Sequence, residues 1–275
     1  YICYGVNFNK IEALKRIDDC TISHIYQTQD NAIWIASTDG LLRFEGKNAM
    51  PVSFSCPGWI LELECGEGRY IWHISTEVIQ RANLISQQTE VVANHDINFR
   101  GCITMARGDS LFVSNNEDLY CCNNDGLYLY GSMPQEEIIS SMLDTEDGGF
   151  LISTRCGKIY KDNGSGQKQQ IHNCQKPIRK LFSDSKGRLW AGLLQGGVIM
   201  IENGKLQEFP VPVKDARTMC EDQHGNILVG STGCLFTILT DGKIKMENPG
   251  TPGAHSITNI FKDAEGIYNE GFYFY

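Results

Sequence analysis

Residues 183–202, SDSKGRLWAGLLQGGVIMIE, contain the pattern that decides the fold of this chain. A turn signal at residues 184–187 precedes a short apolar run at 189–191, and a second turn at 196–197 precedes another apolar run at 198–201. Aspartate can hydrogen-bond to its own backbone two residues on, and glycine accepts a positive φ, so both clusters favour tight turns. The stretch therefore predicts two short β-strands with turns before and between them.

The same pattern recurs about seven times along the 275 residues. Its units lie 38 to 40 residues apart when they are aligned on one apolar residue of the strand after the first turn, at Trp34, Trp72, Phe112, Leu151, Trp190, Leu228 and Tyr268. A weaker fourth run, as at residues 51–54 and 206–210, fills the interval before the next unit. Four short strands per unit are typical of a propeller blade, so we expect an all-β, seven-bladed β-propeller of four-stranded blades.

Helical repeats of similar period are the competing interpretation of this spacing. Residues 9–17 are the one candidate helix, and their apolar spacing is equally compatible with a strand. The unbroken repeat predicts a single domain spanning residues 1–275, which we expect to be part of a longer protein. The last unit begins at Ile257 and is cut short. We therefore expect residues 1–14 to add outer strands to it, which would close the ring and cover exposed strand edges.

The composition excludes some classes of function. The formal net charge is −9, and the basic residues are scattered, which argues against a nucleic-acid-binding surface. No stretch approaches the roughly 20 apolar residues that a membrane helix needs, so no membrane contact is expected of this chain. The 11 cysteines are odd in number, irregularly spaced and without a C-x-x-C motif. They favour buried free thiols, while the pairing of any of them is left open.

No motif for catalysis, a metal or a cofactor is found. The Asp-x-x-Gly turns lack the alternating oxygen ligands and distal glutamate of a calcium loop, so turn chemistry is the better interpretation. The sequence contains neither H-E-x-x-H nor G-x-S-x-G. We therefore predict no catalytic residue, no metal site and no cofactor.

The candidate binding residues lie in the loops that connect successive units, except Arg155, which lies in a turn between two strands that is expected at the same end. Such loops gather at one end of a propeller, around the mouth of its central channel. Trp59 lies in one of these loops and could stack on a sugar, and the others carry mostly charged side chains. The predicted ligand-binding residues are Trp59, Arg100, Glu136, Arg155, Lys176, Arg217 and His255. This mixed set suits a small polar ligand or a protein partner, although each residue alone is equally compatible with a solvated loop.

The repeat resembles the regulator-propeller repeat of extracytoplasmic sensor regions in hybrid two-component systems, especially those of glycan-degrading bacteria. That unit reads approximately I-x-x-I-x-x-D-x-x-G-x-L-W-I-G-T-x-x-G-L-x-x-F. Residues 178–192 and 33–44 match it closely, whereas the units around Trp72 and Phe112 lack the Asp-x-x-Gly turn. The resemblance covers most of the chain and is specific to a fold more than to a ligand.

The resemblance implies a non-catalytic, ligand-sensing and dimer-organising propeller that responds to a carbohydrate and can form a homodimer. Full-length relatives continue with a second propeller, a β-sandwich domain, a membrane helix and a histidine kinase. It also implies an extracytoplasmic, periplasmic location, whereas the free cysteines leave a cytoplasmic one open. Two alternatives remain. One is a propeller scaffold that binds only protein. The other is a metal-dependent enzyme like the streptogramin lyases, for which His255 with Glu136 or Glu77 is the nearest constellation.

Overall fold

The computed structural model describes residues 22–27, 33–37, 40–45, 48–52, 62–65, 69–86, 88–99, 101–145, 147–211, 215–232, 234–247, 256–262 and 268–273. These residues form strands and turns with no helix among them, so the all-β prediction is confirmed. The candidate helix at residues 9–17 and the expected closing strands at 1–14 lie outside the described residues. The described residues form two compact units, one up to Glu136 and one from Glu137 onward.

The unit up to Glu136 contains three four-stranded antiparallel sheets, and in each sheet neighbouring strands are consecutive in sequence. The first sheet consists of β1 (Ile22–Gln27), β2 (Ile33–Ser37), β3 (Gly40–Glu45) and β4 (Asn48–Val52). The second consists of β5 (Glu62–Cys65), β6 (Tyr70–Ile74), β7 (Val78–Asn83) and β8 (Thr89–Asn94). The third consists of β9 (Thr104–Arg107), β10 (Ser110–Asn115), β11 (Asp118–Asn123) and β12 (Gly126–Ser132).

The unit from Glu137 onward contains three more sheets of this kind and one further pair of strands. The first of these sheets consists of β13 (Ile139–Asp144), β14 (Phe150–Thr154), β15 (Lys158–Asp162) and β16 (Lys168–Asn173). The second consists of β17 (Ile178–Ser183), β18 (Leu189–Leu193), β19 (Val198–Glu202) and β20 (Lys205–Phe209). The third consists of β21 (Thr218–Glu221), β22 (Ile227–Gly230), β23 (Leu235–Ile238) and β24 (Ile244–Glu247). The pair is β25 (Ser256–Lys262) and β26 (Tyr268–Tyr273). The described sheets and the pair follow the predicted repeat in order, whereas the number of blades and closure into a ring stay predictions.

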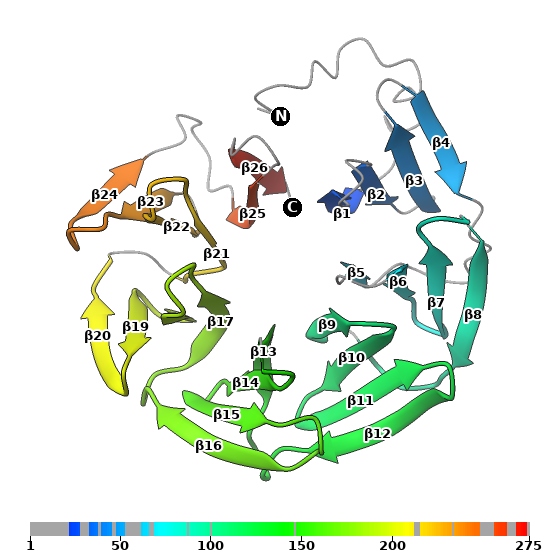
Figure 1. The fold of residues 1–275 in the computed structure, drawn as a ribbon, viewed down its shortest axis with the longest axis horizontal. Coiled ribbons are helices and arrows are strands. Elements are labelled where there is room, and N and C mark those ends of the chain that lie inside the picture. The colour runs from blue at the N-terminus through cyan, green and yellow to red at the C-terminus, as the bar shows by residue number, and fades with distance from the viewer. Residues whose placement is uncertain are drawn as a thin grey trace. The chain divides into compact units, whose positions relative to one another are not determined.

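The sheets of the second unit are arranged with their first strands side by side. Strands β13, β17, β21 and β25 contact one another in turn, and the fourth strands β16, β20 and β24 lie farthest from them (Figure 1). Hydroxyl groups join successive first strands: Ser141 Oγ accepts a hydrogen bond from Leu181 N (3.0 Å), and Thr218 Oγ1 accepts one from Ile260 N (3.3 Å). The repeat therefore fixes the contacts between neighbouring sheets as well as the strands within each sheet.

The Asp-x-x-Gly signals at residues 184–187 and 222–225 form tight turns, as predicted, and the one at 263–266 lies outside the described residues. Asp184 Oδ1 accepts hydrogen bonds from the backbone N–H groups of Lys186 (3.0 Å) and Arg188 (2.9 Å), and Gly187 has φ +72°. Asp222 Oδ1 accepts the corresponding bonds from residues 224 and 226, at 2.7 and 2.8 Å. The aspartates thus satisfy turn amides of their own chain, which is the turn chemistry expected for them.

Tryptophans of the repeat are buried, and two of them fill the spaces between neighbouring sheets. Trp34, Trp72 and Trp190 are 0%, 1% and 2% exposed. Trp190 packs with Phe209 of its own sheet and with residues of β22 and β23 in the next, and Trp72 packs with residues of β10 and β11. Each indole also has an arginine guanidinium within 5.3–5.6 Å of its ring centroid. The aromatic position of the repeat is therefore a packing position.

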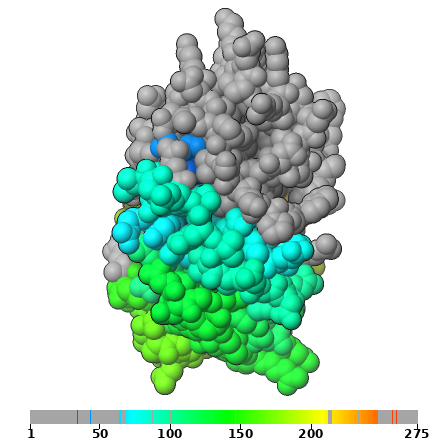
Figure 2. Space-filling view, turned by 90° about the vertical axis from the view of Figure 1, so that its right-hand side faces the viewer, coloured from blue at the N-terminus to red at the C-terminus, as the bar shows by residue number. Residues whose placement is uncertain are grey.

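The fourth strands depart from the sequence prediction. The run expected at residues 51–54 is β4, which begins three residues earlier at Asn48 and ends at Val52. These strands are largely exposed. Val91 of β8 is 52% exposed and Leu129 of β12 is 55% exposed, and Figure 2 looks onto the side of the first unit that carries β8. Exposure removes the apolar pattern from which a strand is recognised in sequence.

The described cysteines are free, and most are buried, as predicted; Cys156 is the exposed exception. Among the described residues, no helix is long and apolar enough to span a membrane.

Candidate ligand-binding site

Loops of the second unit meet at the end of its sheets where β13, β17 and β21 begin. We call this the arginine end, after three arginines found there. Backbone hydrogen bonds connect the loops: Leu194 N donates to Pro177 O, and Ala216 N donates to Leu193 O, both at 2.9 Å. Arg155 N donates to Ile138 O, again at 2.9 Å. The bond from Ala216 joins two successive sheets, and the other two bonds fix loops of the β17–β20 and β13–β16 sheets at this end.

A glycine allows two of these loops to touch. Gly157, in the turn between β14 and β15, has φ +89°, and a Cβ placed on it would lie 2.6 Å from Lys176 O and 2.8 Å from Lys176 N. Cys174 N donates to Gly157 O at 2.8 Å. The turn that carries Arg155 is therefore fixed directly against the loop between β16 and β17, and glycine is needed for both the conformation and the approach.

Arg155 and Arg217, two of the predicted residues, lie at the arginine end together with Arg179, which the sequence analysis did not select. Arg155 is exposed in the turn after β14, Arg179 is exposed near the start of β17, and Arg217 is half-buried just before β21. Burial by surrounding protein lowers the pKa of Arg179, and so does repulsion from Arg217 and Arg155, while Asp215 acts in the opposite direction. The three guanidinium groups are therefore electrostatic neighbours.

Asp215 holds Arg217 in place. Its Oδ2 lies 2.7 Å from Arg217 Nε, and its Oδ1 accepts a hydrogen bond from Thr232 Oγ1 at 3.1 Å. Asp215 is buried, and the backbone N–H of Arg217 is bonded to Gly230 O at 2.9 Å. This arrangement orients one guanidinium group and leaves the exposed Arg155 and Arg179 beside it.

A second carboxylate supports the same end from inside. Glu137 is buried, and its side chain accepts hydrogen bonds from Lys158 Nζ (2.5 Å) and Tyr160 Oη (2.7 Å). Burial and the bond to Glu137 raise the pKa of Tyr160 to about 12, so its hydroxyl stays a donor at neutral pH. Because Ile138 follows Glu137 directly and accepts the bond from Arg155 N, this network helps to position the Arg155 turn.

The other predicted residues are placed differently. Lys176 is exposed, and its ammonium group donates to both oxygens of Glu208 on β20, at 2.6 and 2.7 Å, so it is directed toward a fourth strand. Glu136 is the last residue of the first unit and is exposed, with φ +67°. Trp59, Arg100 and His255 lie outside the described residues. The binding role of all seven stays a prediction.

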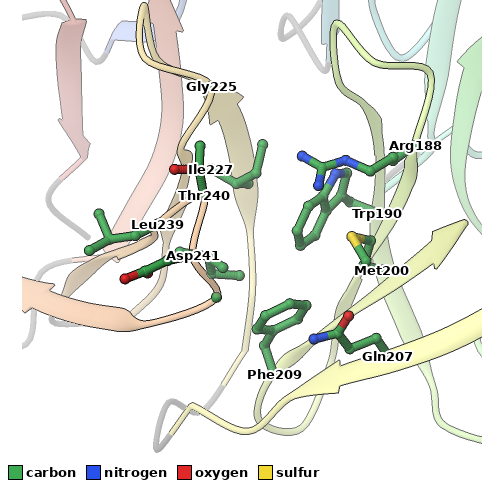
Figure 3. A pocket seen from close by; sticks show the side chains of 12 residues that line it. Arg188, Trp190, Met200, Gln207, Phe209, Gly225, Ile227, Leu239, Thr240 and Asp241 are labelled. Carbon is green, nitrogen blue, oxygen red and sulfur yellow. The ribbon is translucent and has the colours of Figure 1, made fainter.

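A pocket of about 250 Å³ lies elsewhere in the second unit, between the β17–β20 and β21–β24 sheets (Figure 3). Trp190 and Phe209 form its aromatic side, with ring centroids 5.5 Å apart, and Gln207, Thr240 and Asp241 contribute polar groups. The turns that border it, at Gly225 and at residues 240–242, are at the opposite end of these sheets from Arg217. The Trp190 Nε1–H already donates to Asp184 Oδ2 at 2.8 Å. The pocket is therefore a gap in the packing between these two sheets.

Metal ligands do not gather in the part of the chain that the structure describes: no group of three or more His, Cys, Asp or Glu side chains there could hold an ion. Of the residues considered for a lyase-like site, Glu77 and Glu136 are described and His255 is not. The site that the described residues do form is a basic one.

Solved structures share this fold. The extracellular domain of a hybrid two-component system from B. thetaiotaomicron has a TM-score of 0.69 and 17% sequence identity over 91% of this chain and 37% of that chain. A second such domain from the same organism has a TM-score of 0.67 and 14% identity over 92% of this chain and 38% of that chain. The present chain thus spans less than two-fifths of the length of these domains.

A lyase is also structurally similar. Virginiamycin B lyase from Staphylococcus aureus, in a catalytically inactive form with quinupristin, has a TM-score of 0.72 and 12% identity over 88% of this chain and 89% of that chain. No protein-family model matches the sequence, and a comparison with curated proteins finds no match. At these identities the structural comparisons establish the fold: repeated four-stranded antiparallel sheets like those of the sensor extracellular domains.

Proposed function

We propose that this chain is a ligand-sensing propeller from the extracytoplasmic region of a hybrid two-component system, and that its ligand is a carbohydrate. The observation that carries the proposal is the match of more than nine-tenths of the chain to extracellular domains of such systems. The regulator-propeller pattern of residues 178–192 supports it independently. In this proposal the chain is one seven-bladed domain, is not itself catalytic, and lies in the periplasm.

In this proposal, signalling depends on a change in the relative populations of two arrangements of the sensor. A ligand shifts a sensor between two arrangements only if it binds one of them more tightly than the other. The arginine end offers a set of fixed polar groups on successive sheets, which suits recognition of a small polar molecule. Binding there would bias how two sensor regions associate as a homodimer and, through them, a histidine kinase across the membrane.

Ligand-dependent thermal stabilisation tests the proposal. The 275-residue chain is screened with neutral and acidic oligosaccharides while its melting temperature is recorded. A ligand present at 100 times its Kd adds about 2.7 kcal/mol to the unfolding free energy, which corresponds to roughly 5 °C for a domain of this size. We expect at least one oligosaccharide to give such a shift, and Trp59→Ala to reduce it. The absence of a shift with every saccharide would contradict carbohydrate sensing.

A streptogramin-lyase-like enzyme is the second candidate, because the match to virginiamycin B lyase extends over 89% of that enzyme. Incubation with quinupristin and a divalent cation distinguishes the two functions. Turnover that is abolished by His255→Ala would favour the lyase over the sensor. If neither saccharide binding nor turnover is observed, a protein-binding scaffold is the remaining interpretation.

A further inference from the structure

Three successive sheets of the second unit each contribute one arginine to the arginine end. Arg155 comes from the β14–β15 turn, Arg179 from β17 and Arg217 from the loop before β21. The bond from Cys174 N to Gly157 O joins the Arg155 turn to the loop before β17, and the bonds from Leu194 N to Pro177 O and from Ala216 N to Leu193 O join the start of β17 to the loop before β21. The arginines are therefore brought together by the regular contacts between sheets and not by one mobile loop.

Among the described residues, one carboxylate is paired with this cluster of three arginines. Asp215 is engaged with Arg217 at 2.7 Å, and within the described part of the chain neither Arg155 nor Arg179 forms an ion pair. Several other cations of the unit are paired: Lys158 with Glu137, Lys176 with Glu208 and Arg188 with Asp184. The chain as a whole carries a net charge of −9, so three neighbouring arginines with one carboxylate partner form a positive cluster on an acidic molecule.

Guanidinium groups are suited to one kind of ligand group. Their planar donors match the oxygens of a carboxylate or a sulfate and form charge-assisted hydrogen bonds, which are shorter and stronger than neutral ones. Arg155 and Arg179 are exposed and therefore accessible, and Arg217 forms an ion pair with Asp215, which accepts a hydrogen bond from Thr232. Mutual repulsion among the three arginines would be relieved when an anion binds between them.

We propose that Arg155, Arg179 and Arg217 bind an acidic group, a carboxylate or a sulfate, of the saccharide that this chain senses. The proposal rests on the proposed sensing function and narrows its ligand to acidic glycans. The arginines would bind the acidic group, and the remaining loop residues would contact the neutral parts of the sugar.

Two matched pairs of saccharides test the proposal by isothermal titration calorimetry on the 275-residue chain. The first pair is trigalacturonate and its methyl ester, and the second is galactotriose with and without a sulfate ester. We expect one acidic saccharide to bind about tenfold or more tightly than its neutral partner. A hydrogen bond to a charged group contributes more free energy than a neutral one, and the difference corresponds to about a tenfold change in Kd. The pair that shows the difference identifies the carboxylate or the sulfate.

Variants then locate the site. Arg155→Gln and Arg179→Gln remove exposed charges, and each should weaken the acidic saccharide about tenfold. Lys186→Gln is the matched control, because Lys186 is exposed in the turn at the opposite end of β17 and should leave binding unchanged. Unchanged melting temperatures for the unliganded variants establish that all three are folded. Rising salt concentration should weaken the acidic saccharides more than the neutral ones.

The inference is overturned if acidic and neutral partners bind equally, if Arg155→Gln and Arg179→Gln behave like Lys186→Gln, or if no acidic saccharide binds. Binding of neutral saccharides under those outcomes would leave the sensing function supported and remove only the acidic specificity. A lack of stabilisation by every saccharide in the thermal screen would instead remove the sensing function itself.

Discussion

At the scale of single residues, the carboxylate of Asp184 links the Asp-x-x-Gly turn to the buried tryptophan of the repeat. Asp184 accepts bonds from two turn amides, from Arg188 Nε (2.6 Å) and from the buried Trp190 Nε1 (2.8 Å). The indole nitrogens of Trp34 and Trp72 have no acceptor among the described residues. The unit around Trp72 lacks the Asp-x-x-Gly turn, and Gly66 stands at the position of Asp184. Aspartate at this position therefore connects the turn to the core.

Asp184→Asn should destabilise the protein in a pH-dependent way. Burial opposes ionisation of Asp184, but hydrogen bonds from Trp190 and Arg188 outweigh it and lower its pKa. A pKa below the unfolded value of about 3.9 adds stability above that pH, and this stability is lost as the pH falls through the folded pKa. We expect a loss of about 1.5–3 kcal/mol at pH 7, measured by urea unfolding, that shrinks below about pH 4.

Asp222→Asn is the matched comparison for this experiment. Asp222 caps an equivalent turn, but its Oδ2 accepts a hydrogen bond from Asn226 Nδ2, whereas Oδ2 of Asp184 accepts bonds from an arginine and a buried indole. Its substitution should therefore cost less than that of Asp184. Equal losses for the two variants would show that the contact with Trp190 adds nothing to the turn.

Alanine substitutions at Gly157 and Gly187 distinguish the cost of backbone strain from the cost of close packing. Both have a positive φ, of +89° and +72°, but a Cβ would meet backbone atoms of Lys176 only at Gly157, whereas Gly187 has open space. Gly187→Ala should cost about 1–2 kcal/mol from the left-handed conformation alone. Gly157→Ala should cost clearly more, because the loop beside Arg155 must move. Thermal unfolding of both variants measures the difference, and similar losses would refute the packing role of Gly157.

At the scale of elements, hydroxyl groups between first strands help to join neighbouring sheets. Ser141 is buried and accepts the bond from Leu181 N, and Thr218 occupies the corresponding position in the β21–β24 sheet. Ser141→Ala leaves a buried N–H unpaired, which should lower the unfolding free energy by about 1–3 kcal/mol in urea denaturation. Ser141→Thr keeps the hydroxyl that Thr218 uses and should preserve most of this stability. If Thr proves as destabilising as Ala, crowding and not the hydrogen bond decides stability there.

The elements also show what sequence could and could not predict. In units such as that of residues 178–202, the turns and the second and third strands follow from Asp, Gly and continuous apolar runs, because burial on both faces selects those residues. Strand β20, KLQEF, is exposed at four of its five positions, so its bounds depend on pairing with β19 and not on its own pattern. Arg179 was not among the predicted residues, because these were sought in loops and Arg179 lies on strand β17. The signal that could have indicated it is a charged residue between the apolar Ile178 and Leu181.

At the scale of the whole molecule, the unanswered structural question is how the last unit is completed. Each of the six other units has four described strands, whereas β25 and β26 form a pair, so β26 has one edge that the described residues leave unpaired. An unpaired edge is a site for association with another strand. Because the repeat period leaves residues 1–14 without a unit of their own, they are the segment best suited to fill this position.

Deletion of residues 1–14 tests this closure. If they pair with β26, the deletion should lower the melting temperature by roughly 5 °C or more, equivalent to about 2 kcal/mol for a domain of this length. It should also accelerate amide hydrogen exchange in residues 268–273 while leaving β17–β20 unchanged, since repeat units interact mainly with their neighbours. A synthetic peptide of residues 1–14, added to the shortened chain, should restore protection in β26. Slow exchange in β26 without residues 1–14 would mean that another segment covers this edge, and the seven-unit ring would then need a different closing strand.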